Sequence, residues 1–214
     1  MRTTWSVAAL LLALSLLTPG QGWGDELNES YFPLKEGRRW EYNVISDQGA
    51  TKKLVITNLA PREVKGTKVT PRKWELGGST FIELMKQDET GTYRYAEQKG
   101  EQAPPDLITP MECHLKFPVA EGSNWNMATK MGNSTVNVSL TIESLSDEVK
   151  VPAGTFKDCV KIKQVGENAG MSVMGYEWYA PKVGVVKSVV TIKQKSKEGT
   201  KSETRTYQLV SFKP

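Results

Sequence analysis

The chain has 214 residues, with 28 Lys and Arg against 24 Asp and Glu and a formal net charge of +4. This charge is too small to indicate a nucleic-acid-binding protein, and a chain of this length can bury one sizeable hydrophobic core. One His and two Cys leave few residues for nucleophilic catalysis or for a zinc site.

The first 24 residues have the pattern of a secretory signal peptide. Arg2 precedes an apolar run at 7–17, which is too short to span a bilayer. Small residues fit cleavage after Gly22 or after Gly24, and an uncleaved anchor is the alternative. No Cys for lipid attachment follows either position. We therefore expect an exported, soluble protein, periplasmic or secreted, with no transmembrane anchor after cleavage.

The frame F-P-x-x-E-G-x-x-W occurs twice, at 32–40 and at 117–125. In each copy the Pro favours an extended approach, the Gly permits a tight turn, and the Trp carries a large apolar surface inward. The two frames therefore predict the starts of two β halves, each of which places a Trp in the core.

Apolar and polar residues alternate along much of the first half, which is typical of half-buried strands. The expected strands span residues 40–45, 53–57, 72–76, 80–86 and 92–96. Gly77-Gly78 suits a two-residue hairpin turn. Residues 99–112 hold Pro104, Pro105 and Pro110 without hydrophobic periodicity, which predicts a connector.

The second half repeats this alternation after the second frame, most clearly at 136–142. Further strands are expected at 149–151, 159–165, 176–180, 185–193 and 203–212. Ser146-Asp147 predicts a turn between the strands at 136–142 and 149–151. The Lys and Arg of the last hairpin indicate a charged sheet edge.

These elements predict an all-β protein, an antiparallel meander that forms an open or half-closed barrel. A single domain would span 25–214, with halves at about 31–98 and 113–212 joined by the connector at 99–112. The halves suggest a diverged internal repeat. The alternative is that two hairpins use the same turn chemistry independently.

Three segments together resemble a known group: 31–40 (YFPL, then Gly37 and Trp40), 151–159 (VPAGTFKDC) and 178–184 (WYAPKVG). The order and the residues of these segments are similar to those of a widespread group of uncharacterised exported bacterial proteins and lipoproteins that carry a domain of unknown function. The likeness covers most of the chain after the leader. It implies a bacterial envelope setting and a β-rich fold, and it brings no catalytic residues. The chain differs from lipoprotein members because it lacks the lipidation cysteine.

Cys113 and Cys159 are the two cysteines, and in an oxidising compartment such a pair often forms a disulfide. One observation opposes a bridge. Val160 and Ile162 are expected to face the core, which would place Cys159 on the other face of the strand with Lys161. Both alternatives stay open from the sequence.

Catalytic and metal sites have little support. His114 has Cys113 as its neighbour, but adjacent strand residues point to opposite faces, so we expect a solvated histidine. Acidic pairs at 88–89 and 147–148 lie at turn signals, where solvated carboxylates are usual. Met171 and Met174 could hold Cu(I), although methionine more often fills gaps in a core. We expect no metal and no cofactor.

The aromatic residues offer the best candidate site. In a barrel they could line a pocket for an apolar ligand, or they could form the core itself. The candidates are Trp40, Tyr42, Trp125, Tyr176 and Trp178.

The function predicted from these patterns is a non-catalytic binding or interaction module, for an apolar or amphipathic ligand or for an envelope protein partner. One alternative is a hydrolase that uses His114 or an acidic pair. Another is a purely structural envelope protein with a filled interior.

Overall fold

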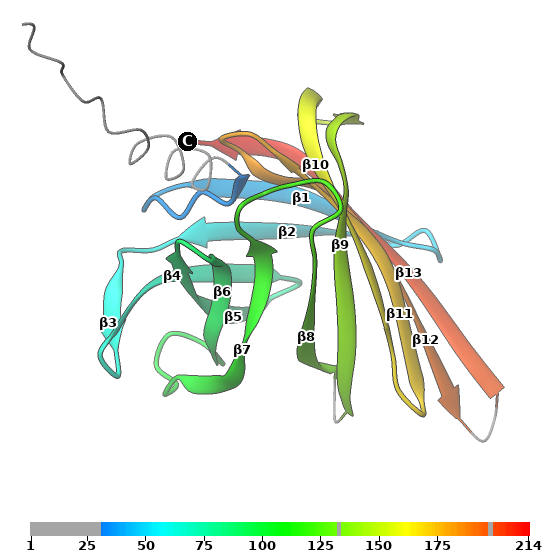
Figure 1. Cartoon of the computed structure of the whole chain (residues 1–214), viewed down its shortest axis with the longest axis horizontal. Helices are drawn as coiled ribbons and strands as arrows, with labels where there is room; N and C mark the ends of the chain where they lie inside the picture. Colours follow the sequence, from blue (N-terminus) through cyan, green and yellow to red (C-terminus); the bar gives the residue numbers. More distant parts are fainter. Residues whose placement is uncertain (1–30, 132–133, 197–198) are drawn as a thin grey trace, which may run out of the picture.

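The computed structural model describes residues 31–131, 134–196 and 199–214, and the predicted signal peptide lies outside these residues. In this part of the chain the regular secondary structure is almost entirely β (Figure 1). The strands are β1 (Arg39–Ser46), β2 (Thr51–Asn58), β3 (Arg62–Val64), β4 (Thr67–Leu76), β5 (Ser79–Asp88), β6 (Gly91–Gln98), β7 (Asp106–Lys116), β8 (Asn124–Met131), β9 (Ser134–Val151), β10 (Gly154–Glu167), β11 (Met171–Ala180), β12 (Gly184–Ser196) and β13 (Gly199–Lys213).

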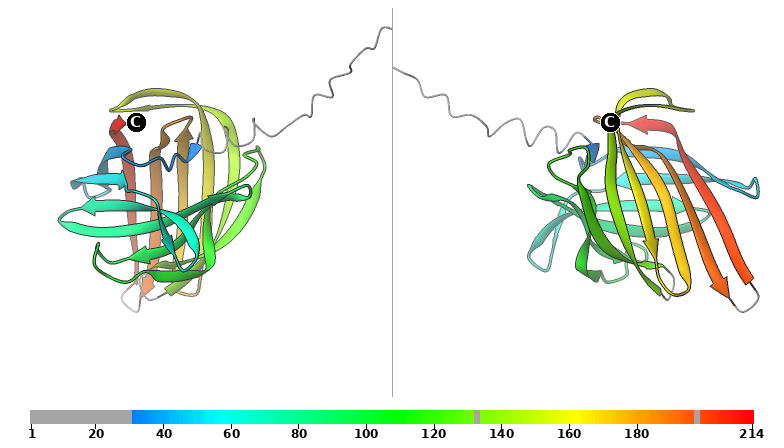
Figure 2. Two further views of the ribbon diagram at one scale, coloured as in Figure 1. Left: turned by 90° about the vertical axis from the view of Figure 1, so that its left-hand side faces the viewer. Right: turned by 45° about the vertical axis from the view of Figure 1, so that its right-hand side comes forward.

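Twelve of these strands form one antiparallel sheet in the order β7-β6-β5-β4-β2-β1-β13-β12-β11-β10-β9-β8, and β3 pairs with β4 beside this path. The sheet curls into a nearly closed barrel (Figure 2). Its two ends, β7 and β8, are consecutive in the chain, and no backbone pairing between them occurs in the described residues. We call this unpaired boundary the seam. The predicted all-β, half-closed barrel is confirmed.

The barrel closes elsewhere through the two ends of the chain, because β1 pairs with β13 from Arg39↔Lys213 to Ser46↔Arg205. The last hairpin is therefore not a sheet edge, and the prediction of a charged edge there was wrong. Alternation along β13 places Lys201 and Arg205 beside a cavity instead.

The two F-P-x-x-E-G-x-x-W frames form similar local structures. Gly37 and Gly122 have φ of 81° and 80°, a region that glycine adopts without strain. Each frame leads directly into a strand whose second residue is the Trp, Trp40 in β1 and Trp125 in β8. Their side chains are buried, with exposed fractions of 0% and 9%. This likeness supports the predicted repeat. The two copies differ in pairing: β1, which follows the first frame, pairs with β13, whereas β8, which follows the second frame, does not pair with β7.

The stretch predicted as a connector is partly regular. Residues 99–105 form the loop after β6, and β7 begins at Asp106 and pairs back onto β6. Prolines in and before β7 interrupt the apolar–polar alternation that would have predicted this strand. Pro is tolerated in β7 because this strand lies at the seam and one of its edges is unpaired. The break in the sheet therefore falls after this stretch.

The β9–β10 hairpin is longer and less regular than the sequence suggests. β9 runs through the predicted turn at Ser146-Asp147, and Asp147 accepts a hydrogen bond from Trp178 Nε1 (2.9 Å). Register shifts in β10 lie on both sides of Cys159. Such irregularities rotate a residue to the other face, so Cys159 is fully buried rather than on the face with Lys161.

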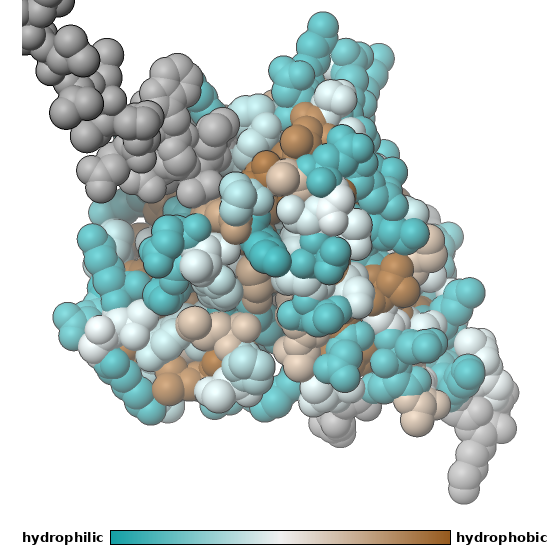
Figure 3. Space-filling view, viewed as in Figure 1, coloured by the Kyte–Doolittle hydropathy of each residue, from teal (hydrophilic) through white to brown (hydrophobic). Residues whose placement is uncertain are grey.

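The interior is divided into two large apolar clusters. One lies among β8 to β12 and includes Leu140, Ile142 and Ile162. The other lies among β1, β2 and β13 and includes Trp40 and the tip of the β9–β10 hairpin. Ala153 N at this tip donates to Leu209 O (3.0 Å), so the hairpin covers one end of the barrel. The face seen in Figure 3 is mostly hydrophilic, with small separate hydrophobic patches.

Candidate functional site

A cavity of about 230 Å³ lies inside the barrel, between the two large apolar clusters. Its apolar wall comes mainly from aromatic and aliphatic side chains of β1, β2, β11 and β12, together with Phe32. Six polar side chains also face the same space. The polar residues on the wall are Arg72, Glu83, His114, Gln164, Glu177 and Ser188.

Arg72, in β4, is the most unusual of these groups. Only 4% of the residue is exposed. Its guanidinium lies between two rings, 4.9 Å from the centroid of Phe32 and 4.7 Å from that of Trp40. Among the described residues no side-chain hydrogen bond or ion pair reaches this guanidinium, and its Nε is buried without a partner. Buried charges are normally paired, whereas Arg72 has two cation–π contacts and only longer-range attraction to Glu83 and Glu177.

His114, in β7, also lacks a partner at a buried atom, Nε2. Burial is the main cause that lowers its pKa to about 3, and the nearby Arg94 and Arg72 contribute to this decrease. The imidazole is therefore neutral at physiological pH. The expectation of a solvated histidine was wrong, because the side chain faces the cavity and lies 6.4 Å from the Phe32 ring, centroid to centroid.

The two carboxylates on the cavity wall already have donors. Glu177 accepts from Tyr179 OH (2.6 Å), and Glu83 accepts from Trp74 Nε1 (2.9 Å) and lies 3.5 Å from Arg94 Nη1. Burial raises the pKa of both carboxyl groups, although the neighbouring arginines oppose this.

Arg94 differs from Arg72 because it forms ion pairs with buried carboxylates. Its Nη1 lies 3.5 Å from Glu83 and its Nη2 lies 2.6 Å from Glu112, although its Nε is also buried without a partner. The interior thus contains one ion-paired arginine and, beside it, one arginine without an ion pair.

A second, wider cavity of about 1090 Å³ opens at the end of the barrel opposite the β9–β10 tip. It lies next to the first cavity along the same inner faces of the strands. In β1, Tyr42 lines the first cavity and Val44 lines the second, and in β12 the corresponding residues are Val190 and Ile192. Charged side chains also line it, among them Lys52, Glu203 and Arg205. We call this wider cavity the mouth.

The structure places the five aromatic candidates in different settings. Tyr42 lines the cavity, and its OH donates to Val185 O (2.7 Å). Trp40 lies behind the wall, where its Nε1 donates to Val183 O (2.7 Å) and its ring stacks on Phe212. Trp125 belongs to the core at the seam, and its Nε1 donates to Cys113 O (2.8 Å).

Tyr176 and Trp178 lie on the opposite face of β11 from Glu177. Their rings are 6.0 Å apart, and the ammonium groups of Lys161 and Lys187 lie over them. Tyr176 borders the cavity, but this ring contact directs its side chain to the outer face.

Sequence reasoning missed Arg72, Glu83 and Glu177 as parts of the site. Arg72 and Trp74 share a face of β4 at spacing two, as do Glu83 and Phe81 in β5. This alternation was the available signal, since it mixes charged residues into an otherwise aromatic face.

Both cysteines are free thiols in the structure, so the candidate bridge is not formed. Cys113 packs against the first large cluster and Cys159 belongs to the second. Burial raises the pKa of each thiol to about 11.

In the described part of the chain no group of three or more His, Cys, Asp or Glu is placed to hold a metal ion. Met171 packs on the inner face whereas Met174 is 49% exposed, so these two do not share a site. The same residues contain no helix long and apolar enough to cross a membrane.

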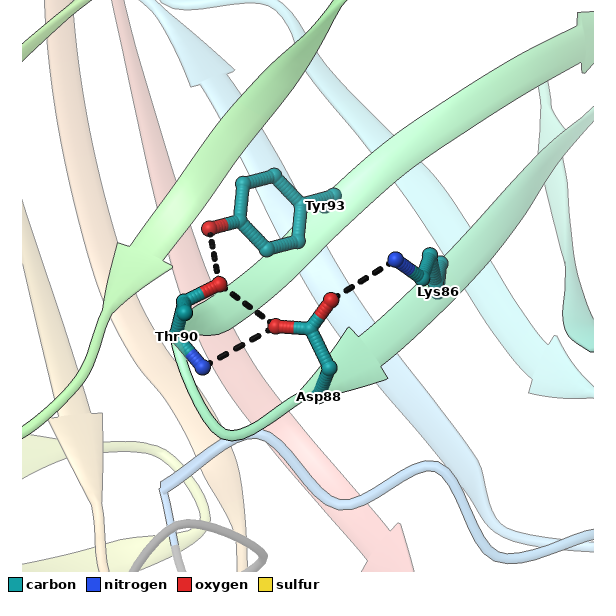
Figure 4. A network of polar contacts seen from close by, with 4 residues as sticks. All are labelled: Lys86, Asp88, Thr90 and Tyr93. Carbon is teal, nitrogen blue, oxygen red and sulfur yellow. Dashed lines mark hydrogen bonds and ion pairs between the residues drawn. The ribbon is translucent and has the colours of Figure 1, made fainter.

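The acidic residue at the β5–β6 turn has a local role. Asp88 accepts hydrogen bonds from Lys86 Nζ (2.7 Å) and from the backbone and hydroxyl of Thr90, which also contacts Tyr93 OH (Figure 4). Partial burial opposes ionisation, but these hydrogen bonds outweigh it and lower the pKa of Asp88 to about 2. Thr90 O also accepts from Phe117 N (2.9 Å), so the network secures this turn beside the second frame.

Together these features define an antiparallel β-barrel with one unpaired seam and a partly polar internal cavity. A family model described as DUF3108-like matches residues 83–205, and the chain belongs to this family. No curated protein matches the chain.

Two solved structures are similar in fold. One is a candidate exported protein with a YmcC-like fold from Bacteroides fragilis NCTC 9343, with 18% identity, a TM-score of 0.48, and coverage of 86% of this chain and 99% of that one. The other is a candidate lipoprotein from Parabacteroides distasonis ATCC 8503, with 14% identity, a TM-score of 0.44, and coverage of 86% and 98%.

Proposed function

We propose that this protein is an exported, non-catalytic binding module that holds a small amphipathic molecule inside its barrel. The observation that carries the proposal is the internal cavity, whose apolar wall contains polar groups without protein partners and which continues into the mouth. A concave, mostly apolar space with a few convergent polar groups is typical of small-molecule sites. The leader pattern at 1–24 supports export.

The size of the cavity limits the ligand. At about 30 Å³ for each water-sized group, a volume of 230 Å³ holds about eight non-hydrogen atoms. This is smaller than the roughly 300–1,000 Å³ of drug-sized pockets. The enclosed part of the ligand is therefore small, and any longer chain extends into the mouth.

Binding without catalysis fits the ionisation of the groups on the wall. A general base works best when its pKa lies near the working pH, whereas His114 has a pKa of about 3. Its Nε2 has no serine, cysteine or carboxylate partner among the described residues. These observations favour a binding site over the hydrolase alternative, and the cavity itself favours it over a purely structural protein.

Isothermal titration calorimetry with 1-octanol, a neutral amphiphile, tests the proposal. We expect saturable binding to the purified protein and its loss in Ser188→Trp, because Ser188 lines the cavity and the indole would fill it. The matched control is Ser172→Trp, since Ser172 lies in β11 on the opposite face from the buried Val173 and should leave binding unchanged. No binding to the wild type, or equal loss in both variants, would reject the cavity as the site.

A further inference from the structure

The unpaired guanidinium of Arg72 determines what kind of head group the cavity can take. A buried arginine offers five N–H donors in a planar fork, and this fork matches the two oxygens of a carboxylate. Within the described chain, the Arg72 guanidinium contacts the rings of Phe32 and Trp40, and no ion pair or side-chain hydrogen bond reaches it. The rings fix its position but accept no hydrogen bond in its plane. A hydrogen-bond acceptor on a bound ligand would therefore satisfy the unpaired donors of this guanidinium.

The other charged groups around the cavity do not supply that acceptor. Glu177 is held by Tyr179, and Glu83 is shared between Trp74 and Arg94. Neither lies within ion-pair distance of Arg72, although both are close enough for its charge to influence them. His114 adds a second unpartnered nitrogen on the same wall, and a neutral imidazole can donate from Nε2.

We propose that the cavity binds the carboxylate of a single-chain monocarboxylic acid at Arg72 and His114, with its alkyl chain directed along β1 and β12 towards the mouth. This inference rests on the proposed function and names its ligand class. Two features fit such a molecule: the unpartnered donors lie in the smaller cavity, and apolar Val44 and Ile192 line the mouth next to it. The enclosed volume accommodates a head and a short chain, so the end of a longer chain would reach the charged residues of the mouth.

A cationic head group fits the same space less well. It would approach an arginine that has no counter-ion in contact, and the two carboxylates that could attract it already accept hydrogen bonds. Like charges in a low-dielectric interior repel strongly. The sign of the preferred head group is therefore a direct test of the role of Arg72.

The test compares three probes of equal chain length by calorimetry: octanoate, 1-octanol and octyltrimethylammonium. A charge-assisted hydrogen bond contributes about 1.5–3 kcal/mol, so we expect octanoate to bind about 10-fold to 100-fold more tightly than 1-octanol. The ammonium probe should bind more weakly than 1-octanol. In Arg72→Met, which keeps an apolar side chain of similar length, octanoate should lose this advantage while 1-octanol binding persists.

Two further variants complete the design. Arg72→Lys retains the charge without the planar fork and should keep only part of the preference for octanoate. Arg39→Met, which removes an exposed guanidinium on the opposite face of β1 from Trp40, should leave the preference unchanged. If octanoate binds no more tightly than 1-octanol in the wild type, or the ammonium probe binds best, the carboxylate inference is wrong while the binding function stands. If none of the probes binds, both are wrong.

Discussion

The seam of the barrel is held by side chains rather than by backbone pairing, and replacing Trp125 with Phe tests this. In the described residues two side-chain hydrogen bonds cross the seam, from Trp125 Nε1 to Cys113 O (2.8 Å) and from Lys116 Nζ to Asn124 O (3.3 Å). The first comes from an indole that is only 9% exposed. Phe keeps an aromatic ring at this position but removes the N–H donor.

The expected cost follows from the group left behind. Leaving the partly buried Cys113 carbonyl without its partner costs about 1–3 kcal/mol, and the smaller ring adds a packing loss of about 1 kcal/mol. The free energy of unfolding should therefore fall by about 2–4 kcal/mol. For a domain of this size that corresponds to a decrease in Tm of about 4–16 °C.

The measurements are thermal or urea unfolding and amide hydrogen exchange of β7 and β8. Trp178→Phe is the matched control, because it removes an indole donor to Asp147 Oδ2 at a position away from the seam. We expect faster exchange in β7 for Trp125→Phe alone. Unchanged exchange in β7, with a loss of stability no larger than in the control, would show that the indole does not hold the seam.

Three other predictions concern particular residues. Asp88→Asn should lower stability by about 1 kcal/mol near neutral pH, since the site is partly exposed. In the wild type this contribution should be complete above the unfolded pKa of 3.8 and should disappear as the pH falls through about 2, as acid titration of both proteins by circular dichroism can check. Gly91→Ala should destabilise the β6–β7 pair, because a Cβ would lie 2.6 Å from Leu115 O, and a urea midpoint that does not fall would contradict this. Cys113 and Cys159 should react slowly with iodoacetamide at pH 8 in the native state, because the thiol pKa of each is about 11, yet both should be alkylated in urea without reductant; a mass lacking two adducts would indicate a bridge.

The fold could be predicted largely from local signals. Alternation located most strands, and Gly77-Gly78 does form the turn between β4 and β5. The paired frames located Trp40 and Trp125 at the starts of β1 and β8. These features depend on residues close in sequence, so that period and turn chemistry are sufficient to predict them.

The rest depends on contacts that no local pattern contains. Cys159 is buried because register shifts flank it, and β7 is a strand despite Pro110 because its pairing with β6 compensates. Arg72 reads in the sequence as an ordinary surface charge of a strand. The pairing of β4 with β2 and of β2 with β1 brings it to the rings of Phe32 and Trp40, which lie 40 and 32 residues earlier in the chain.

The pairing of β1 with β13 also affects the order in which the barrel can form. These strands are separated by nearly the whole described chain, so bringing them together carries a large loop-closure entropy and a high contact order. Until Gly199–Lys213 is available, β1 has an open edge and the cavity lacks the wall that Tyr207 provides. A chain that emerges from its N-terminus therefore acquires a complete internal cavity only at the end of its folding, when its last strand joins its first.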